Sequence, residues 1–209
     1  TKEDLEGIAQ LVLSHELVVL SDEIYSRIIY DGEFHSIASL PGMLERTIIL
    51  DGFSKTYAMT GWRLGYGIMP VEVAQAVSRL ITNSTSCTAT FTQVAGVRAL
   101  TDSQEAVDTM VEAFRQRRDV IVNGLNQIPG FRCLMPRGAF YAFPDITGTG
   151  RKSRELADYL LADASVATLA GTSFGAHGEG FLRLSYANSI ENIHKALDRI
   201  DVAVRKLER

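Results

Sequence analysis

Short apolar runs alternate with segments of helical periodicity along this chain of 209 residues, and this alternation limits the fold more than any other feature. Residues 17–25 (LVVLSDEIY) and 46–55 (RTIILDGFSK) each begin as a continuous apolar run and end in polar residues. Such runs are typical of strands that are buried on both faces of a parallel sheet. Residues 62–69 (WRLGYGIM) predict a third strand. The order of strands and helices predicts an α/β fold.

The other segments of the first part of the chain have the apolar spacing of helices. Thr1 and Asp4 stand at capping-box spacing at the start of a helix over residues 1–16. Residues 71–82 predict a second helix, and residues 92–128 predict one or two long helices that end before Pro129-Gly130.

The remaining residues predict a second, smaller region. Residues 131–146 indicate two strands around a Pro/Gly turn, and a helix follows from Ser153. Residues 169–180 indicate a mobile loop, residues 181–188 a strand, and Ser189 caps a closing helix. We therefore place a domain boundary near Pro129.

Composition argues against several classes of function. The formal net charge is −4 and the arginines are scattered, so the sequence offers no basic surface for nucleic acid. No apolar run reaches the roughly 20 residues that a membrane helix requires. Cys87 and Cys133 are too few for a disulfide framework or a zinc cluster, so we expect reduced cysteines, no metal site and a cytoplasmic location.

Chemically distinctive residues lie where the predicted strands end or begin. Asp22 and Tyr25 follow the first strand, Lys55 follows the second, and Arg63 opens the third. Each could instead have a purely structural role. Asp22 could cap a turn and Tyr25 could be a core aromatic residue. Lys55 could be a surface lysine and Arg63 an ion-pair partner. Together they supply an amine for a Schiff base, a carboxylate for a ring nitrogen, a phenol, and a guanidinium for a phosphate. This set is suited to pyridoxal phosphate.

Four segments resemble the class I/II aminotransferases, which are pyridoxal-phosphate enzymes of fold type I: 21–32 (SDEIYSRIIYDG), 52–66 (GFSKTYAMTGWRLGY), 136–146 (PRGAFYAFPDI) and 181–188 (FLRLSYAN). The resemblance implies that residues 1–128 are the remainder of the large pyridoxal-phosphate-dependent transferase domain, with a mostly parallel sheet and a long connecting helix. It implies that residues 129–209 form the C-terminal small α+β domain. It also implies a homodimer.

The same resemblance assigns roles to the residues at the strand ends. Lys55 would form the Schiff base (internal aldimine) with pyridoxal 5'-phosphate and act as the catalytic acid and base. Asp22 would pair with the pyridine nitrogen of the cofactor, and Tyr25 would donate a hydrogen bond to its phenolic oxygen.

Phosphate and substrate contacts follow from the resemblance as well. Ser54 and Arg63 would hold the cofactor phosphate, although Gly52 stands where many relatives have a further serine. Arg183 lies in the alternating pattern of residues 181–185, and the resemblance implies that it binds the α-carboxylate of the substrate. The residue pattern alone also allows an internal ion pair for Arg183.

The function implied by the resemblance is the transfer of an amino group between an amino acid and a 2-oxo acid. Two alternatives remain at this stage: a β-lyase on the same scaffold, and a non-catalytic interaction or effector-sensing module that retains the fold. The resemblance covers only the carboxyl-terminal half of the family's chain. We therefore expect the 209 residues alone to be inactive.

Overall fold

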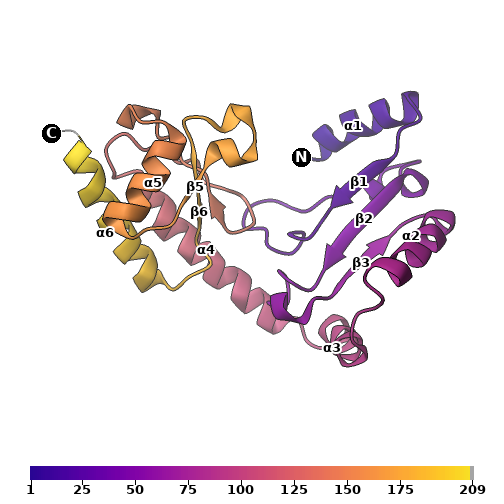
Figure 1. Cartoon of the computed structure of the whole chain (residues 1–209). Coiled ribbons are helices and arrows are strands. Elements are labelled where there is room, and N and C mark those ends of the chain that lie inside the picture. Colours follow the sequence, from indigo (N-terminus) through magenta and orange to yellow (C-terminus); the bar gives the residue numbers. More distant parts are fainter. Residues whose placement is uncertain (208–209) are drawn as a thin grey trace. The chain divides into compact units, whose positions relative to one another are not determined.

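The computed structural model describes residues 1–207, and its chain forms two compact units, Thr1–Asp108 and Thr109–Arg209. The division falls inside helix α4 (Glu105–Leu125). The sequence assigns that helix to the first domain, and a boundary at residue 128 in the whole protein stays a prediction. Figure 1 shows the elements of each unit.

The first unit contains three strands and three α-helices, in agreement with the sequence. Helix α1 begins after Thr1, whose side-chain oxygen accepts a hydrogen bond from the backbone N–H of Asp4 at 3.3 Å. This helix, α1, spans Lys2–Ser14, and the other elements are β1 (Val19–Asp22), β2 (Thr47–Gly52), β3 (Gly65–Ile68), α2 (Val71–Ser84) and α3 (Thr90–Thr101). The predicted α/β fold is confirmed.

The three strands of the first unit form one sheet in the order β1-β2-β3 (Figure 1). Strands β1 and β2 are parallel, and Asp22 lies beside Leu50. Strand β3 is antiparallel to β2, and Gly52 lies beside Gly65. The carboxyl ends of β1 and β2 and the start of β3 therefore meet at one edge of the sheet.

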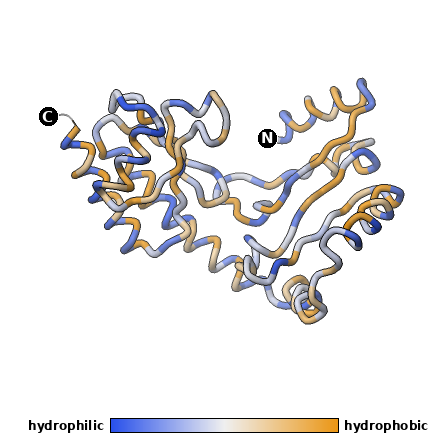
Figure 2. The backbone as a smooth tube through the Cα atoms, in the orientation of Figure 1, coloured by the Kyte–Doolittle hydropathy of each residue, from blue (hydrophilic) through white to orange (hydrophobic). Residues whose placement is uncertain are grey.

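Burial of the sheet differs from the sequence expectation. The core on one face consists of Ala9 and Val12 of α1 packed with Ile37 and Met43, and Val19 of β1 packs against it. Other apolar side chains of the first unit are exposed: Val18, Leu20, Leu50, Ile68, Val71, Leu80, Phe91, Val94 and Val97. Figure 2 shows the corresponding apolar stretches along β1 to β3, α2 and α3. The expectation that these strands are buried on both faces is wrong within residues 1–207.

The second unit packs helices around a small antiparallel sheet with strand order β4-β6-β5. Of the two strands expected in residues 131–146, only β4 (Tyr141–Ala142) forms, beside an isolated bridge between Arg132 and Asp145. The remaining elements are β5 (Leu169–Ala170), β6 (Leu182–Ser185), α5 (Ser153–Ala164) and α6 (Ile190–Leu207).

Helix starts in the second unit agree with the sequence. Helix α5 begins at Ser153, and the Ser189 side chain accepts a hydrogen bond from the N–H of Asn192 at 3.2 Å ahead of α6. Fully buried side chains from three helices and β6 form its core: Leu125, Leu156, Leu160, Leu182 and Ile200.

Ile200 offers a test of this core in the full-length protein. Ile200→Ala should lower the free energy of unfolding by about 2–5 kcal/mol, because it leaves a cavity at a side chain with no exposed surface. Val202→Ala, two residues away in α6 and 56% exposed, should change it by less than about 0.5 kcal/mol. Chemical denaturation measures both, and equal effects would contradict this packing.

Candidate functional site

Lys55 and Tyr25 come together at the edge of the first unit's sheet where β1 and β2 end. Lys55 lies three residues beyond the end of β2, and Tyr25 lies three residues beyond the end of β1. The Lys55 ammonium nitrogen lies 5.9 Å from the centroid of the Tyr25 ring. Both side chains are half-buried. The sheet thus brings an amine and a phenol from segments 30 residues apart into one place.

Asp22 ends β1 at the same edge. Its Oδ1 accepts a hydrogen bond from the N–H of Ile24 at 3.2 Å, and the side chain is otherwise exposed. Within residues 1–207, Oδ2 accepts no hydrogen bond, so one carboxylate oxygen is available to a ligand. A carboxylate fixed by one bond and open at the other oxygen can pair with a protonated ring nitrogen.

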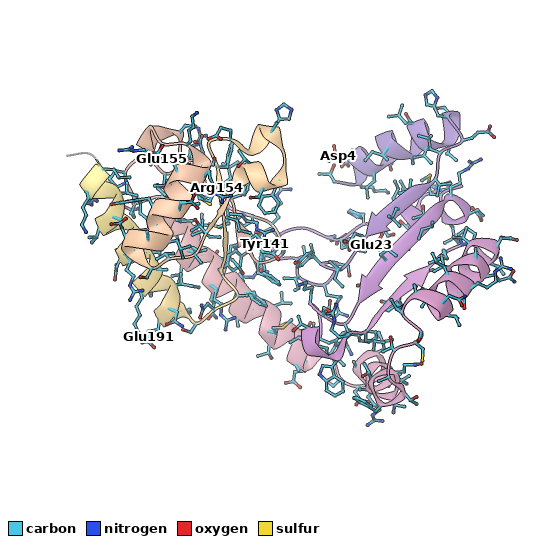
Figure 3. The ribbon with its side chains drawn as sticks, viewed as in Figure 1. Asp4, Glu23, Tyr141, Arg154, Glu155 and Glu191 are labelled. Carbon is cyan, nitrogen blue, oxygen red and sulfur yellow. The ribbon has the colours of Figure 1, made fainter. Side chains whose placement is uncertain are left out.

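Glu23 is a buried residue of this region that the sequence analysis does not single out. Glu23 is labelled in Figure 3, and its Oε1 accepts hydrogen bonds from the hydroxyls of Ser21 at 3.1 Å and Ser36 at 2.6 Å. Its N–H donates to the carbonyl of Leu50 at 2.8 Å, which extends the β1–β2 ladder by one residue. Glu23 therefore fixes the backbone between Asp22 and Tyr25. The sequence feature that could have identified Glu23 is its position as an acidic residue directly after the strand.

The strand end before Ser54 and Lys55 approaches β3 closely. A Cβ at Gly52 would lie 3.0 Å from the Cα of Gly65 and 3.1 Å from the carbonyl oxygen of Leu64. These are tight contacts, so a Cβ at position 52 would require the neighbouring backbone to move by a few tenths of an ångström. Ser54 and Lys55 follow the buried side chain of Phe53, and their side chains are half-buried.

Arg63 lies two residues before the start of β3, in an unusual backbone conformation. It follows the 3-10 turn Thr60–Trp62 and has φ 54° and ψ 48°, in the left-handed region. Non-glycine residues in this region cost on the order of 1 kcal/mol and gather at functional sites. The Arg63 guanidinium donates to the carbonyl of Thr60 at 2.9 Å, and Arg63 lines a cavity of about 700 Å³ with Trp62, Thr88 and Phe91.

Arg183 lies in the second unit, on β6. Its neighbours Leu182 and Leu184 are buried in the core, so the alternation of the strand directs Arg183 to the other face. The guanidinium carbon lies 4.5 Å from the centroid of the Tyr141 ring and 4.3 Å from that of Phe174. Figure 3 labels Tyr141. Cation–π contacts of this kind hold a guanidinium in place and leave its N–H edge able to donate to a carboxylate.

Neither ring beside Arg183 was expected from the sequence to be part of a site. Tyr141 lies in one of the two strands expected over residues 131–146, and Phe174 lies in the segment expected to be a mobile loop. That segment contains two 3-10 turns, Gly171–Phe174 and Ala176–Gly178. No spacing rule connects positions 141, 174 and 183, because the sheet and the loop bring them together.

Comparison with known proteins identifies the family. The profile described as "Aminotransferase class I and II" matches residues 1–200. The chain belongs to the class I and II aminotransferases. Members of this family are generally dependent on pyridoxal phosphate.

Several aminotransferases are similar over nearly the whole chain. Aromatic-amino-acid aminotransferase 2 of Thermococcus litoralis is 43% identical over 209 residues, which are 99% of this chain and 54% of that protein. An aspartate aminotransferase of Pyrococcus abyssi is 43% identical over 208 residues, 98% of this chain and 53% of that protein. The chain thus spans about half the length of these relatives.

A solved structure supports the fold. The aromatic aminotransferase from Pyrococcus horikoshii is 42% identical, with a TM-score of 0.95 over 99% of this chain and 56% of that structure. This likeness confirms the aminotransferase fold. It does not test the individual roles of Asp22, Tyr25, Ser54, Lys55, Arg63 and Arg183.

Within residues 1–207, no three histidine, cysteine, aspartate or glutamate side chains are arranged to hold a metal ion. In the same part of the chain, no helix is both long and apolar enough to span a bilayer.

Proposed function

We propose that the protein carrying this chain is a pyridoxal-phosphate-dependent aminotransferase that moves an amino group between an amino acid and a 2-oxo acid. The observation that carries the proposal is the position of the Lys55 amine, 5.9 Å from the Tyr25 ring at the edge where β1 and β2 end. Family membership and the names of the similar proteins support the same reaction.

The residues of the first unit fit pyridoxal phosphate by their chemistry. Lys55 would hold the cofactor through its amine, Asp22 would pair with the ring nitrogen through Oδ2, and Tyr25 would donate its phenol proton to an oxygen of the cofactor. Ser54 and Arg63 would hold the phosphate. When bound, pyridoxal phosphate supplies a conjugated ring that withdraws electrons from the substrate Cα.

Lys55 would also move the proton in the reaction. An unprotonated amine could remove the proton from the substrate Cα as a general base and then deliver it, as a general acid, to the C4′ carbon of the cofactor. Asp22 would keep a proton on the ring nitrogen, because a carboxylate stabilises the positive charge that this proton brings. Glu23 would assist only by fixing the backbone that carries Asp22 and Tyr25.

Arg183 would bind the α-carboxylate shared by the amino-acid and 2-oxo-acid substrates. A planar guanidinium can donate two parallel hydrogen bonds to a carboxylate. The rings of Tyr141 and Phe174 restrict its movement, which reduces the entropy lost on binding. A homodimer and a cytoplasmic location belong to the same proposal.

Replacement of Lys55 tests the cofactor assignment. In the full-length protein, Lys55→Ala should remove the visible absorption band of the bound cofactor and abolish transamination, because no other amine would replace it. Lys195→Ala is the control, because Lys195 forms an exposed ion pair with Glu191 on α6. This substitution should leave the absorption band and the transamination activity unchanged. A Lys55→Ala variant that retains the band and the activity would contradict the assignment. Pyruvate and ammonia as products, in place of a new amino acid, would indicate a lyase.

Replacement of Arg183 tests the substrate assignment. Arg183→Lys should weaken amino-acid binding by about 2 kcal/mol, because one ammonium cannot reproduce a bidentate contact. Cofactor affinity should change little. Steady-state kinetics measure the effect on the substrate, and a cofactor titration measures the effect on the cofactor. Arg154→Lys is the control, because Arg154 is an exposed arginine that pairs with Asp158 on α5. Equal losses for substrate and cofactor would assign Arg183 a structural role.

A further inference from the structure

The loop that carries Phe174 is fastened to the start of α5 by Ser153. The Ser153 side chain has no exposed surface, and its Oγ accepts hydrogen bonds from the N–H groups of Gly180 at 2.8 Å and Phe181 at 3.1 Å. The same hydroxyl donates to the carbonyl of Gly178 at 3.4 Å. One buried hydroxyl thus joins the last residues of the loop to the first residue of the helix.

Glu179 completes this attachment from within the loop. Its Oε1 accepts hydrogen bonds from the N–H of Ser153 at 2.8 Å and from the N–H of Gly180 at 3.2 Å. Lys152, the residue that precedes α5, makes no side-chain capping bond. The carboxylate of Glu179 caps the helix instead, although it lies 26 residues beyond Ser153 in the sequence. The N–H of Ser153 holds the pKa of Glu179 below its ordinary 4.5, with smaller contributions from Gly180 and Lys152. The side chain is therefore an anion at neutral pH.

The two ends of the loop cross closely, with glycine on both sides. A Cβ on Gly171 would collide with the backbone of Gly178, and a Cβ on Gly178 would collide with the backbone of Gly171. The N–H of Gly171 also donates to the carbonyl of Phe181 at 2.8 Å. Because the ends are held so closely, the path of residues 172–177 depends on the attachment at Glu179 and Ser153.

Phe174 projects from this loop onto Arg183. Its ring is 51% exposed, and its centroid lies 4.3 Å from the Arg183 guanidinium carbon. The ring also meets Phe143 edge-on at 6.4 Å. A half-exposed ring on a short loop is held in position by its backbone more than by burial, and here that backbone is fastened by Glu179.

We propose that Glu179 is a positioning residue for the substrate site: by capping α5 from the loop, it holds Phe174 against Arg183 and so fixes the guanidinium that receives the substrate carboxylate. This inference rests on the function proposed for Arg183. Glu179 acts through Phe174 and has no direct contact with substrate.

Kinetics of the full-length, cofactor-loaded enzyme test the role. Glu179→Ala should raise KM for the amino-acid substrate by about tenfold, roughly the effect of losing one ordering hydrogen bond, while kcat and cofactor affinity stay within about twofold. Glu179→Gln keeps the size of the side chain and should have a smaller effect in the same direction. Glu155→Gln is the matched control, because Glu155 lies in the first turn of α5 but pairs with Arg151 on the surface (Figure 3).

A double-mutant cycle tests the route through Phe174. If Glu179 acts by holding Phe174, then Glu179→Ala combined with Phe174→Ala should have the KM of Phe174→Ala alone, within about twofold. Effects that multiply would show that the two residues act separately, and would overturn the proposal.

Hydrogen exchange gives a measurement that does not depend on activity. In Glu179→Gln, the amide of Ser153 should exchange at least about tenfold faster than in the unchanged protein, because its acceptor is weakened. Unchanged exchange, or faster exchange without a change in KM, would overturn the proposal.

If Arg183→Lys leaves KM unchanged, the function proposed for Arg183 fails and this inference fails with it. If Arg183→Lys raises KM and the Glu179 variants do not, only the positioning role is wrong.

Discussion

The close pairing of β2 with β3 at Gly52 and Gly65 is the constraint on which the candidate cofactor site depends. Because β3 runs antiparallel to β2, the residues that precede β3 lie at the edge where β2 ends, so Arg63 and Lys55 share that edge. Because β1 is parallel to β2, Asp22 and Tyr25 reach the same edge. The backbones are so close here that a Cβ at position 52 would lie 3.0 Å from the Cα of Gly65 and 3.1 Å from the carbonyl oxygen of Leu64. The site therefore depends on backbone geometry before any polar contact is made.

Charged groups in the two units are held in different ways. In the first unit, short hydrogen bonds fix the backbone around the candidate residues: Glu23 binds two serine hydroxyls, and Arg63 binds the carbonyl of Thr60. In the second unit, aromatic rings pack against Arg183, and the loop that supplies one of them is fastened by a carboxylate at a helix start. Both arrangements limit the motion of a charged side chain before a ligand arrives, which lowers the entropy lost on binding.

The sequence predicts features that depend on neighbouring residues and fails for those that depend on distant ones. Thr1 and Ser189 are local capping signals, and the structure confirms both; the predicted start of α5 at Ser153 is also confirmed, although its cap comes from Glu179, 26 residues away. The apolar runs predict β1 and β2, but not the antiparallel direction of β3 or the exposure of Leu20 at 65%, which depend on what packs against the sheet.

The candidate site shows the same division. The strand-end positions of Asp22, Lys55 and Arg63 could be predicted, because they follow from where each run begins or ends. The contacts of Arg183 with Tyr141 and Phe174, and of Glu179 with Ser153, could not, because they join segments between 9 and 42 residues apart with no common spacing. The roles of these residues in binding and catalysis stay predictions.

The central claim is that the Lys55 amine holds the cofactor, and chemical trapping tests it most directly. The full-length protein is loaded with pyridoxal phosphate, reduced with borohydride to fix the cofactor to the amine that holds it, digested, and mapped by mass spectrometry. The expected result is the added cofactor mass on the peptide that contains Lys55, at close to one equivalent per chain. Cofactor fixed on a different lysine, such as Lys152 or Lys195, or no stable addition to a loaded protein, would contradict the account.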